Sequence, residues 1–237
     1  MKAEGIEALC FDVFGTVVDW RSGVARQAEA ILAPRGLSRD GGAFADAWRA
    51  RYQPAMEEVR AGRRPFVKLD VLHRENLEAV LAELGIRDLP EAEKAALNLA
   101  WHRLDPWPDV APGLARLKRR YILAPVSNGN LRLMVDLARH GGLPWDAILG
   151  AEVARAYKPA PEAYLRAAEL LDLPPSACAM VAAHNDDLAA ARDQGFRTVF
   201  VPRPFEHGPG QTTDLEPTAD WDLVARDFDG LATRLGC

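Results

Sequence analysis

The feature that most constrains this chain is a series of five short apolar segments. The segments lie at residues 7–11, 122–126, 147–149, 179–183 and 198–201. Runs of this length are typical of parallel strands that are covered on both faces. Helical spacing of apolar residues occurs at 114–120, 131–140, 162–171 and 188–194. Strands that alternate with helices predict an α/β fold with a doubly wound parallel sheet.

About a hundred residues separate the first expected strand from the second, far more than a crossover requires. This stretch has amphipathic helical patterns at 24–32, 44–59, 67–84 and 91–104, with short breaks between them. We therefore predict an inserted helical domain at residues 20–97, and a core domain formed by residues 1–19 and 98–237.

Composition excludes several classes of function. The formal net charge of −5 argues against sequence-independent binding of nucleic acid. No apolar run is long enough to span a bilayer, and the N-terminal residues lack the layout of a signal peptide. The three cysteines form no metal-binding or redox spacing. We expect a cytoplasmic protein with free thiols and no membrane or nucleic-acid partner.

Polar residues follow four of the apolar segments, at the edge where parallel strands bring their carboxyl ends together. They are Asp12 and Thr16, then Ser127 and Asn128, then Lys158, and finally the His-Asn-Asp-Asp run at 184–187. Each alone is ordinary turn chemistry, but four in succession predict one site. A carboxylate near a lysine and helix N-terminal amides stays ionised, as a carboxylate nucleophile must. Asp12 is the expected nucleophile.

These residues resemble the motifs of the haloacid dehalogenase superfamily over the whole chain. Residues 11–16 (Phe-Asp-Val-Phe-Gly-Thr) match its first motif, 126–129 (Val-Ser-Asn-Gly) the second, 157–159 (Tyr-Lys-Pro) the third and Asp187 the last. The resemblance implies a Rossmann-like core, and the predicted insert lies where this superfamily has its helical cap.

Two positions depart from the magnesium phosphatases of this superfamily. Phe14 stands where a phosphatase has the aspartic acid that protonates the leaving alcohol, and a phenyl ring cannot transfer a proton. Ala183 stands where a phosphatase has an aspartate ligand for magnesium. The resemblance is therefore to the (S)-2-haloacid dehalogenases, which implies that no metal or other cofactor is required.

The resemblance to this subgroup extends into the cap and implies a role for each site residue. Trp48-Arg49 matches a tryptophan-arginine pair, and Tyr164 follows Lys158 at the subgroup's spacing. The implied catalytic residues are Asp12, Lys158, Asp187, Arg49 and Thr16. The implied residues that contact the substrate or halide are Phe14, Arg49, Phe66, Ser127 and Asn128. The implied supporting residues are Tyr164, His184 and Asn185.

The late motif differs from the subgroup's usual Ser-Ser-Asn-x-x-Asp run. Ala182 replaces a serine, and His184 occupies the usual asparagine position, with Asn185 one residue later. His184 either contributes to the active site or forms a local hydrogen bond in a loop, and both readings stay open. Basic residues are also frequent between Arg49 and Lys68, and we expect Arg51 and Arg60 to belong to a solvated helical face.

The implied reaction is hydrolytic dehalogenation of short 2-haloalkanoic acids to 2-hydroxyacids through an ester on Asp12. Inversion at the substrate carbon would convert an S-2-haloacid into an R-2-hydroxyacid. Two alternatives remain: a phosphatase that binds magnesium through Asp12, a backbone carbonyl and Asp187, and a catalytically silent domain that binds a protein through its cap. The resemblance also suggests a homodimer.

Overall fold

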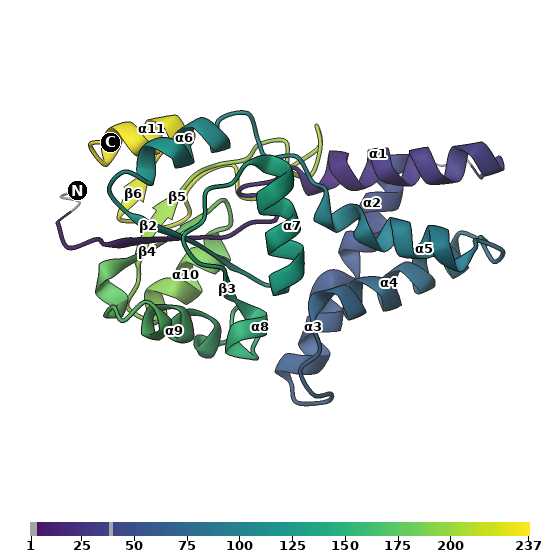
Figure 1. The fold of residues 1–237 in the computed structure, drawn as a ribbon, viewed down its shortest axis with the longest axis horizontal. Helices are drawn as coiled ribbons and strands as arrows, with labels where there is room; N and C mark the ends of the chain where they lie inside the picture. The colour runs from purple at the N-terminus through teal and green to yellow at the C-terminus, as the bar shows by residue number, and fades with distance from the viewer. Residues whose placement is uncertain (1–3, 38–39) are drawn as a thin grey trace.

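The structure is a computed structural model that describes residues 4–37 and 40–237. Within these residues one six-stranded parallel sheet has the order β3-β2-β1-β4-β5-β6 (Figure 1). The strands are β1 (Ala8–Phe11), β2 (Ile122–Ser127), β3 (Leu149–Gly150), β4 (Cys178–Ala182), β5 (Arg197–Phe200) and β6 (Leu223–Val224). The fold class agrees with the prediction, although the sequence pattern did not identify β6.

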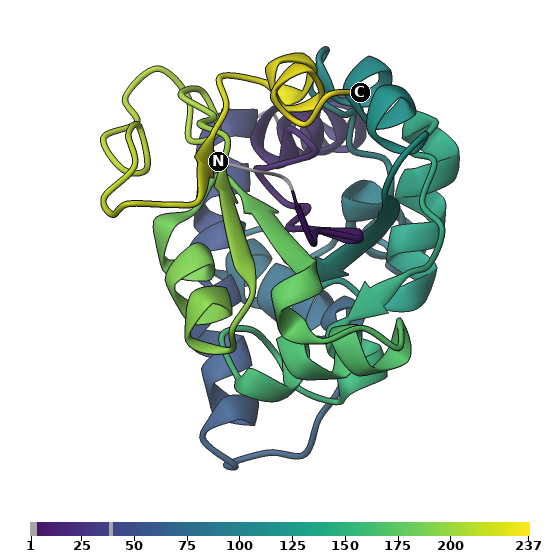
Figure 2. The same cartoon turned by 90° about the vertical axis from the view of Figure 1, so that its left-hand side faces the viewer.

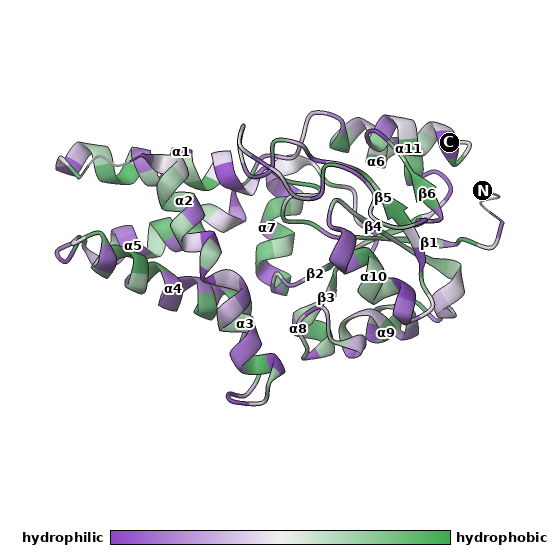
Figure 3. Cartoon of the chain, turned by 180° about the vertical axis from the view of Figure 1, so that it is seen from behind, coloured by the Kyte–Doolittle hydropathy of each residue, from purple (hydrophilic) through white to green (hydrophobic). Residues whose placement is uncertain are grey.

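Helices cover both faces of the sheet (Figure 2). Alternate residues of β1 point to opposite faces, so Leu9 and Phe11 belong to one apolar cluster, and Ala8 and Cys10 to the other. The helices of this core are α6 (Val110–Leu117), α7 (Leu131–Gly141), α8 (Ala151–Ala154), α9 (Pro161–Leu170), α10 (Asn185–Asp193) and α11 (Phe228–Arg234). Hydropathy follows the same arrangement, with apolar strands inside and mixed helices outside (Figure 3). Among the described residues, no helix has both the length and the apolar composition that a membrane span requires.

A second group of helices forms the helical cap on one side of the sheet (Figure 1). Its helices are α1 (Trp20–Leu32), α2 (Gly41–Ala50), α3 (Tyr52–Arg60), α4 (Leu69–Glu83) and α5 (Glu91–Asn98), with short 3₁₀ helices at Ala33–Arg35 and Leu99–His102. Asp19 caps α1 by accepting a hydrogen bond from the backbone N–H of Ser22.

The expected helices at 44–59 and 91–104 are each divided in the structure. The first is broken at Arg51, between α2 and α3. Pro54 lies in the first turn of α3, where its missing N–H costs nothing, but it could not continue a helix that runs through from α2. The break therefore places Arg49 near the end of α2 and Tyr52 at the start of α3.

Candidate active site

Asp12 follows β1 directly, in a loop that a glycine makes possible. The Asp12 backbone N–H donates to the Val181 carbonyl of the neighbouring strand, which extends the sheet by one residue. Gly15 then takes a φ of +90°, a conformation that side chains disfavour. This turn brings Thr16 back under the carboxylate, and its Oγ1 donates to Asp12 Oδ2 at 2.7 Å. The same hydroxyl accepts from the Ala183 backbone N–H at 2.9 Å, so Thr16 orients Asp12.

Lys158 joins the two buried carboxylates of the site. Its Nζ lies 2.8 Å from Asp12 Oδ1 and 2.6 Å from Asp187 Oδ2. Asn128 supports the lysine, since its Oδ1 accepts a hydrogen bond from the Lys158 backbone N–H at 2.8 Å. The Tyr164 hydroxyl donates to the other oxygen of Asp187 at 2.7 Å. Asp187 therefore has both oxygens engaged.

The electrostatics of this group keep Asp12 ionised. Burial alone would raise the pKa of Asp12, but Lys158 and His184 outweigh burial and hold that pKa far below its ordinary value. Burial alone would also lower the pKa of Lys158, whereas Asp12 and Asp187 raise it above the usual lysine range. A buried anion held by a fixed cation is suited to nucleophilic attack.

A cavity of about 410 Å³ opens above Asp12, between the sheet edge and cap helices α2 and α3. Eight predicted site residues line it: Asp12, Phe14, Arg49, Asn128, Lys158, Tyr164, His184 and Asp187. Its volume suits a small organic molecule.

Arg49 supplies this cavity with a cation that lies among aromatic rings. Its guanidinium carbon lies 4.0 Å from the centre of the Tyr52 ring, 5.2 Å from that of Trp20 and 5.9 Å from that of Phe14. Its Nη1 is buried and has no hydrogen-bond partner in the part of the chain that the structure describes. A buried donor without an acceptor is costly, so the arrangement suits an anion that enters the cavity.

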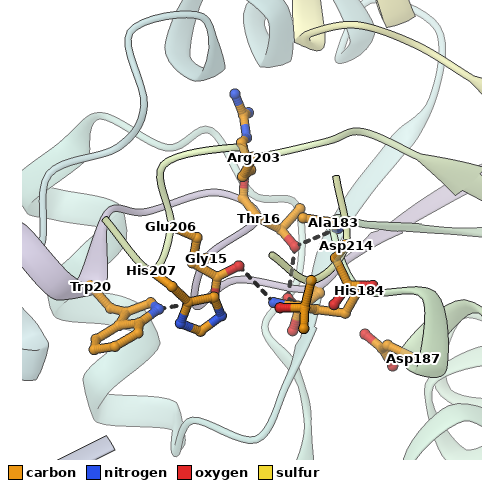
Figure 4. Close-up of polar contacts among 12 residues, drawn as sticks. Gly15, Thr16, Trp20, Ala183, His184, Asp187, Arg203, Glu206, His207 and Asp214 are labelled. Atoms are coloured by element: carbon orange, nitrogen blue, oxygen red, sulfur yellow. Dashed lines mark hydrogen bonds and ion pairs between the residues drawn. The ribbon is translucent and has the colours of Figure 1, made fainter. Parts of the chain in front are cut away.

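His184 lines the cavity and contacts Asp12, so its hydrogen bonds are not confined to its own loop. Its Nδ1 lies 3.1 Å from Asp12 Oδ2, and its Nε2 lies 2.9 Å from Glu206 Oε2 (Figure 4). Burial alone would lower the pKa of His184, but Glu206 and Asp12 raise it well above the ordinary value. The imidazole is thus positively charged while both carboxylates are ionised.

Two residues that were expected to contact the substrate or halide do not line the cavity. Phe66 does not line the cavity. Its ring centre lies 5.1 Å from that of Tyr157, and the guanidinium carbon of Arg155 lies 4.7 Å from the centre of the Phe66 ring. The loop after α3 turns Phe66 away from the cavity, and Tyr52 supplies an aromatic wall instead.

Ser127 is the second of these residues, and Asn185, expected in a supporting role, does not line the cavity either. Ser127 is fully buried at the end of β2, where its Oγ accepts from the Gly129 N–H. Asn185 uses its amide to hold the segment after β5: Nδ2 donates to Asp214 and Oδ1 accepts from the Trp221 ring N–H. Its supporting role is to fix this segment.

Sequence reasoning did not find several residues of the site. Tyr52, Gln53 and Asp214 line the cavity, and Glu206 contacts His184. Arg60 also lines the cavity and donates to the Lys158 carbonyl, so the expectation of a solvated face was wrong for Arg60. Tyr52 lies three residues after the predicted cap residue Arg49, and this closeness in the sequence is the signal that could have identified it.

The donor set around Asp12 does not fit a magnesium ion. Magnesium requires several oxygen ligands in octahedral geometry, yet the Lys158 ammonium lies between Asp12 and Asp187. Ala183 offers no side-chain oxygen, and the second oxygen of Asp12 is engaged by Thr16 and His184. Across residues 4–37 and 40–237, no cluster of three or more His, Cys, Asp or Glu side chains is suited to a metal.

Comparison with known proteins agrees with this geometry. A family model described as haloacid dehalogenase-like hydrolase matches residues 6–195. An (S)-2-haloacid dehalogenase of Pseudomonas sp. strain YL is 32% identical over 220 residues, covering 90% of this chain and 91% of that protein. The crystal structure of a defluorinating L-2-haloacid dehalogenase has a TM-score of 0.97 at 48% identity and covers 100% of this chain and 99% of its own. A second L-2-haloacid dehalogenase structure has a TM-score of 0.94 at 49% identity, covering 97% and 98%.

Proposed function

Because this chain belongs to the haloacid dehalogenase-like hydrolase family, we propose that it hydrolyses short (S)-2-haloalkanoic acids to (R)-2-hydroxyacids. One observation carries the proposal: an ionised, buried carboxylate and an arginine whose buried Nη1 has no hydrogen-bond partner among the described residues line the same small cavity. The first is a nucleophile, and the second receives an anion. Dehalogenation needs both, because a halide leaves as the carboxylate attacks.

In the first step, Asp12 attacks the carbon that bears the halogen and forms an ester. Halide leaves from the opposite face, which inverts the configuration of that carbon. Arg49 stabilises the charge that develops on the halide, since a donor that is already positioned requires no reorganisation. Phe14 and Tyr52 form an apolar wall beside it and keep water from competing for the guanidinium.

In the second step, water attacks the carboxyl carbon of Asp12 and releases the hydroxyacid. The substrate carbon is not touched, so its inverted configuration persists. Lys158 and Thr16 hold the carboxyl group in one orientation through both steps. Covalent capture thereby divides one difficult displacement into two easier reactions.

The phosphatase alternative receives no support from the site. Phe14 contacts the rings of Trp101 and Tyr52 edge-on, so the position of the missing general acid is filled by hydrocarbon. Lys158 already forms ion pairs with the two carboxylates that a metal would need. The ionised Asp12 and the Nη1 donor of Arg49, which has no hydrogen-bond partner among the described residues, likewise disfavour a catalytically silent binding domain.

The test is release of halide by the purified protein with EDTA present. The substrates are chloroacetate, fluoroacetate and each enantiomer of 2-chloropropionate. We expect halide from the S enantiomer and little from the R enantiomer, and no halide from the Asp12→Asn variant. Fluoroacetate reports whether the activity extends to the carbon-fluorine bond, as in the similar defluorinating L-2-haloacid dehalogenase.

A different result would overturn the proposal. If all four acids remain intact and phosphate esters are hydrolysed after magnesium is added, the phosphatase alternative is correct. If Asp12→Asn retains wild-type release of halide, Asp12 is not the nucleophile. Circular dichroism of the variant establishes that its fold is intact.

Three further expectations accompany this function as proposals. The cap comprises residues 20–97, between two parts of the core at 1–19 and 98–237. The protein acts in the cytoplasm, and two copies form a homodimer. Limited proteolysis, fractionation of cells and sedimentation velocity test these three proposals in turn.

A further inference from the structure

His184 is the only histidine among the residues lining the described cavity, and it lies between two carboxylates from opposite sides. Asp12 belongs to the loop after β1, and Glu206 belongs to the segment after β5. Figure 4 shows the contact between Glu206 and His184. Glu206 contacts Nε2 of the imidazole, and Asp12 contacts Nδ1. A carboxylate on one ring nitrogen fixes the orientation of the imidazole and increases the basicity of the other nitrogen.

Glu206 is held firmly in this position. The residue is 1% exposed, and its Oε1 accepts a hydrogen bond from the Trp20 ring N–H at 2.9 Å. Gly15 provides the space: a Cβ at that position would lie 2.1 Å from Glu206 Oε1 and 2.2 Å from its carboxyl carbon. The glycine therefore serves both the turn after Asp12 and the close approach of Glu206.

Hydrolysis of an ester requires a group that accepts a proton from water. Asp187 is poorly placed for this, because Lys158 occupies one of its oxygens and Tyr164 donates to the other. Lys158 is a cation and cannot accept a proton. His184 is the remaining titratable group in contact with the carboxyl group that water must attack.

Formation of the ester changes the charge that His184 senses. In the free enzyme two carboxylates hold the imidazole in its protonated form, and this raises its pKa. Once Asp12 is an ester it carries no charge, so one of these two partners is lost and the pKa of His184 falls. The imidazole can then release a proton to the solvent and become a base.

We propose that His184, oriented by Glu206, accepts the proton of the water that hydrolyses the Asp12 ester. The inference rests on the proposed dehalogenase function. Water oxygen bonds to the Asp12 carboxyl carbon, and one proton passes to Nδ1 of His184. The bond from that carbon to the substrate oxygen then breaks, and the departing alkoxide takes the second proton of the water. Asp12 returns as a carboxylate and His184 as a cation, so each turnover consumes one water and releases one halide and one proton.

Other charges also face His184 and are retained when the ester forms. Glu206 contacts its ring, and His207 lies 3.7 Å from Glu206. The other charged residues that line the same cavity are Asp186, Asp187, Asp214, Lys158, Arg49 and Arg60. Glu206 is the carboxylate that contacts His184 in both stages. Glu206→Gln removes this anion, so it lowers the pKa of His184 and moves the acid limb of ester hydrolysis to lower pH. The imidazole also becomes a weaker base, which lowers the rate of ester hydrolysis above that limb.

The experiment is rapid quench of S-2-chloropropionate turnover with His184→Asn and Glu206→Gln, followed by mass spectrometry of the intact protein. We expect both variants to release one equivalent of chloride per site in a fast burst. The ester on Asp12 should then accumulate, and steady turnover should fall about 10²-fold or more. Matched controls are His140→Asn and Glu216→Gln, two exposed positions outside the cavity that should behave like the wild type.

Two results would overturn the proposal. Ester hydrolysis at the wild-type rate in both variants would show that another group accepts the proton. Loss of the burst without accumulation of ester would place His184 in the first step. If His184→Asn does not fold, Glu206→Gln gives the same readout. Failure of the proposed function is distinguishable, because the wild type would then release no chloride at all.

Discussion

The guanidinium of Arg49 lies 4.0 Å above the ring of Tyr52, although the two residues come from different helices. Stacking on an aromatic face stabilises a cation without supplying a hydrogen-bond acceptor. The Nη1 donor of Arg49 consequently stays unused among the residues described. The break between α2 and α3 thus creates an anion receptor that is ready before a substrate arrives.

Replacement of this cation by a shorter one should impair the departure of halide. We expect Arg49→Lys to lower kcat/KM for S-2-chloropropionate by about 10²-fold, because an ammonium does not reproduce the planar stacked donor. The control is Arg51→Lys, a nearby arginine that pairs with Glu83 on the surface. Equal activity of the two variants would contradict the role of Arg49.

Removal of the lysine between the carboxylates should affect both activity and stability. We expect Lys158→Met to abolish turnover and to lower the free energy of unfolding by about 3–5 kcal/mol, because Asp12 and Asp187 lose their shared cation. Lys118→Met, which removes an exposed pair with Asp146, should cost less than about 1 kcal/mol. Urea denaturation of both variants measures these differences.

The loss in Lys158→Met should also depend on pH. The lowered pKa of Asp12 in the wild type contributes stability that is present above the unfolded pKa and lost as the pH falls. Without the lysine, a carboxylate can take up a proton in mild acid. The deficit of the variant should therefore shrink toward low pH, and a constant deficit would contradict this explanation.

The buried side chain of His73 should make the stability of the fold sensitive to acid. Burial lowers the pKa of His73 to about 3, and neither ring nitrogen has a hydrogen-bond partner within the described residues. A lowered histidine pKa stabilises the fold above the unfolded pKa of about 6.5, and this stability is lost as the pH falls toward 3. His73→Phe should keep the stacking on Trp101 and reduce the acid-side loss by on the order of 4 kcal/mol. If His73→Phe and the wild type lost stability equally toward low pH, this role of His73 would be contradicted.

The order of polar residues after the strands was enough to predict where the site lies. Asp12, Lys158 and Asp187 meet because parallel strands bring their carboxyl ends to one edge, a consequence of topology that the sequence pattern reveals. Arg49 was identified only through its resemblance to a known motif. Its stacking on Tyr52 depends on the helix break at Arg51, which the continuous amphipathic pattern over 44–59 did not reveal.

Glu206 could not be predicted, for a physical reason. It lies in an irregular segment after β5, where no periodicity relates a residue to the sheet. Its contacts are to Trp20 and His184, and only the assembled fold brings these three residues together. Phe66 shows the opposite error, because its aromatic type suited the cavity while its loop packs it on Tyr157.

The most direct test of the account is a single turnover in water labelled with oxygen-18, with enzyme in excess over S-2-chloropropionate. If Asp12 forms the ester and water attacks its carboxyl carbon, the label enters the Asp12 carboxylate, and the first hydroxyacid released carries none. Mass spectrometry of the peptide that contains Asp12 measures the incorporation. Label in the hydroxyacid and none in Asp12 would mean that water attacks the substrate directly, which would contradict the account.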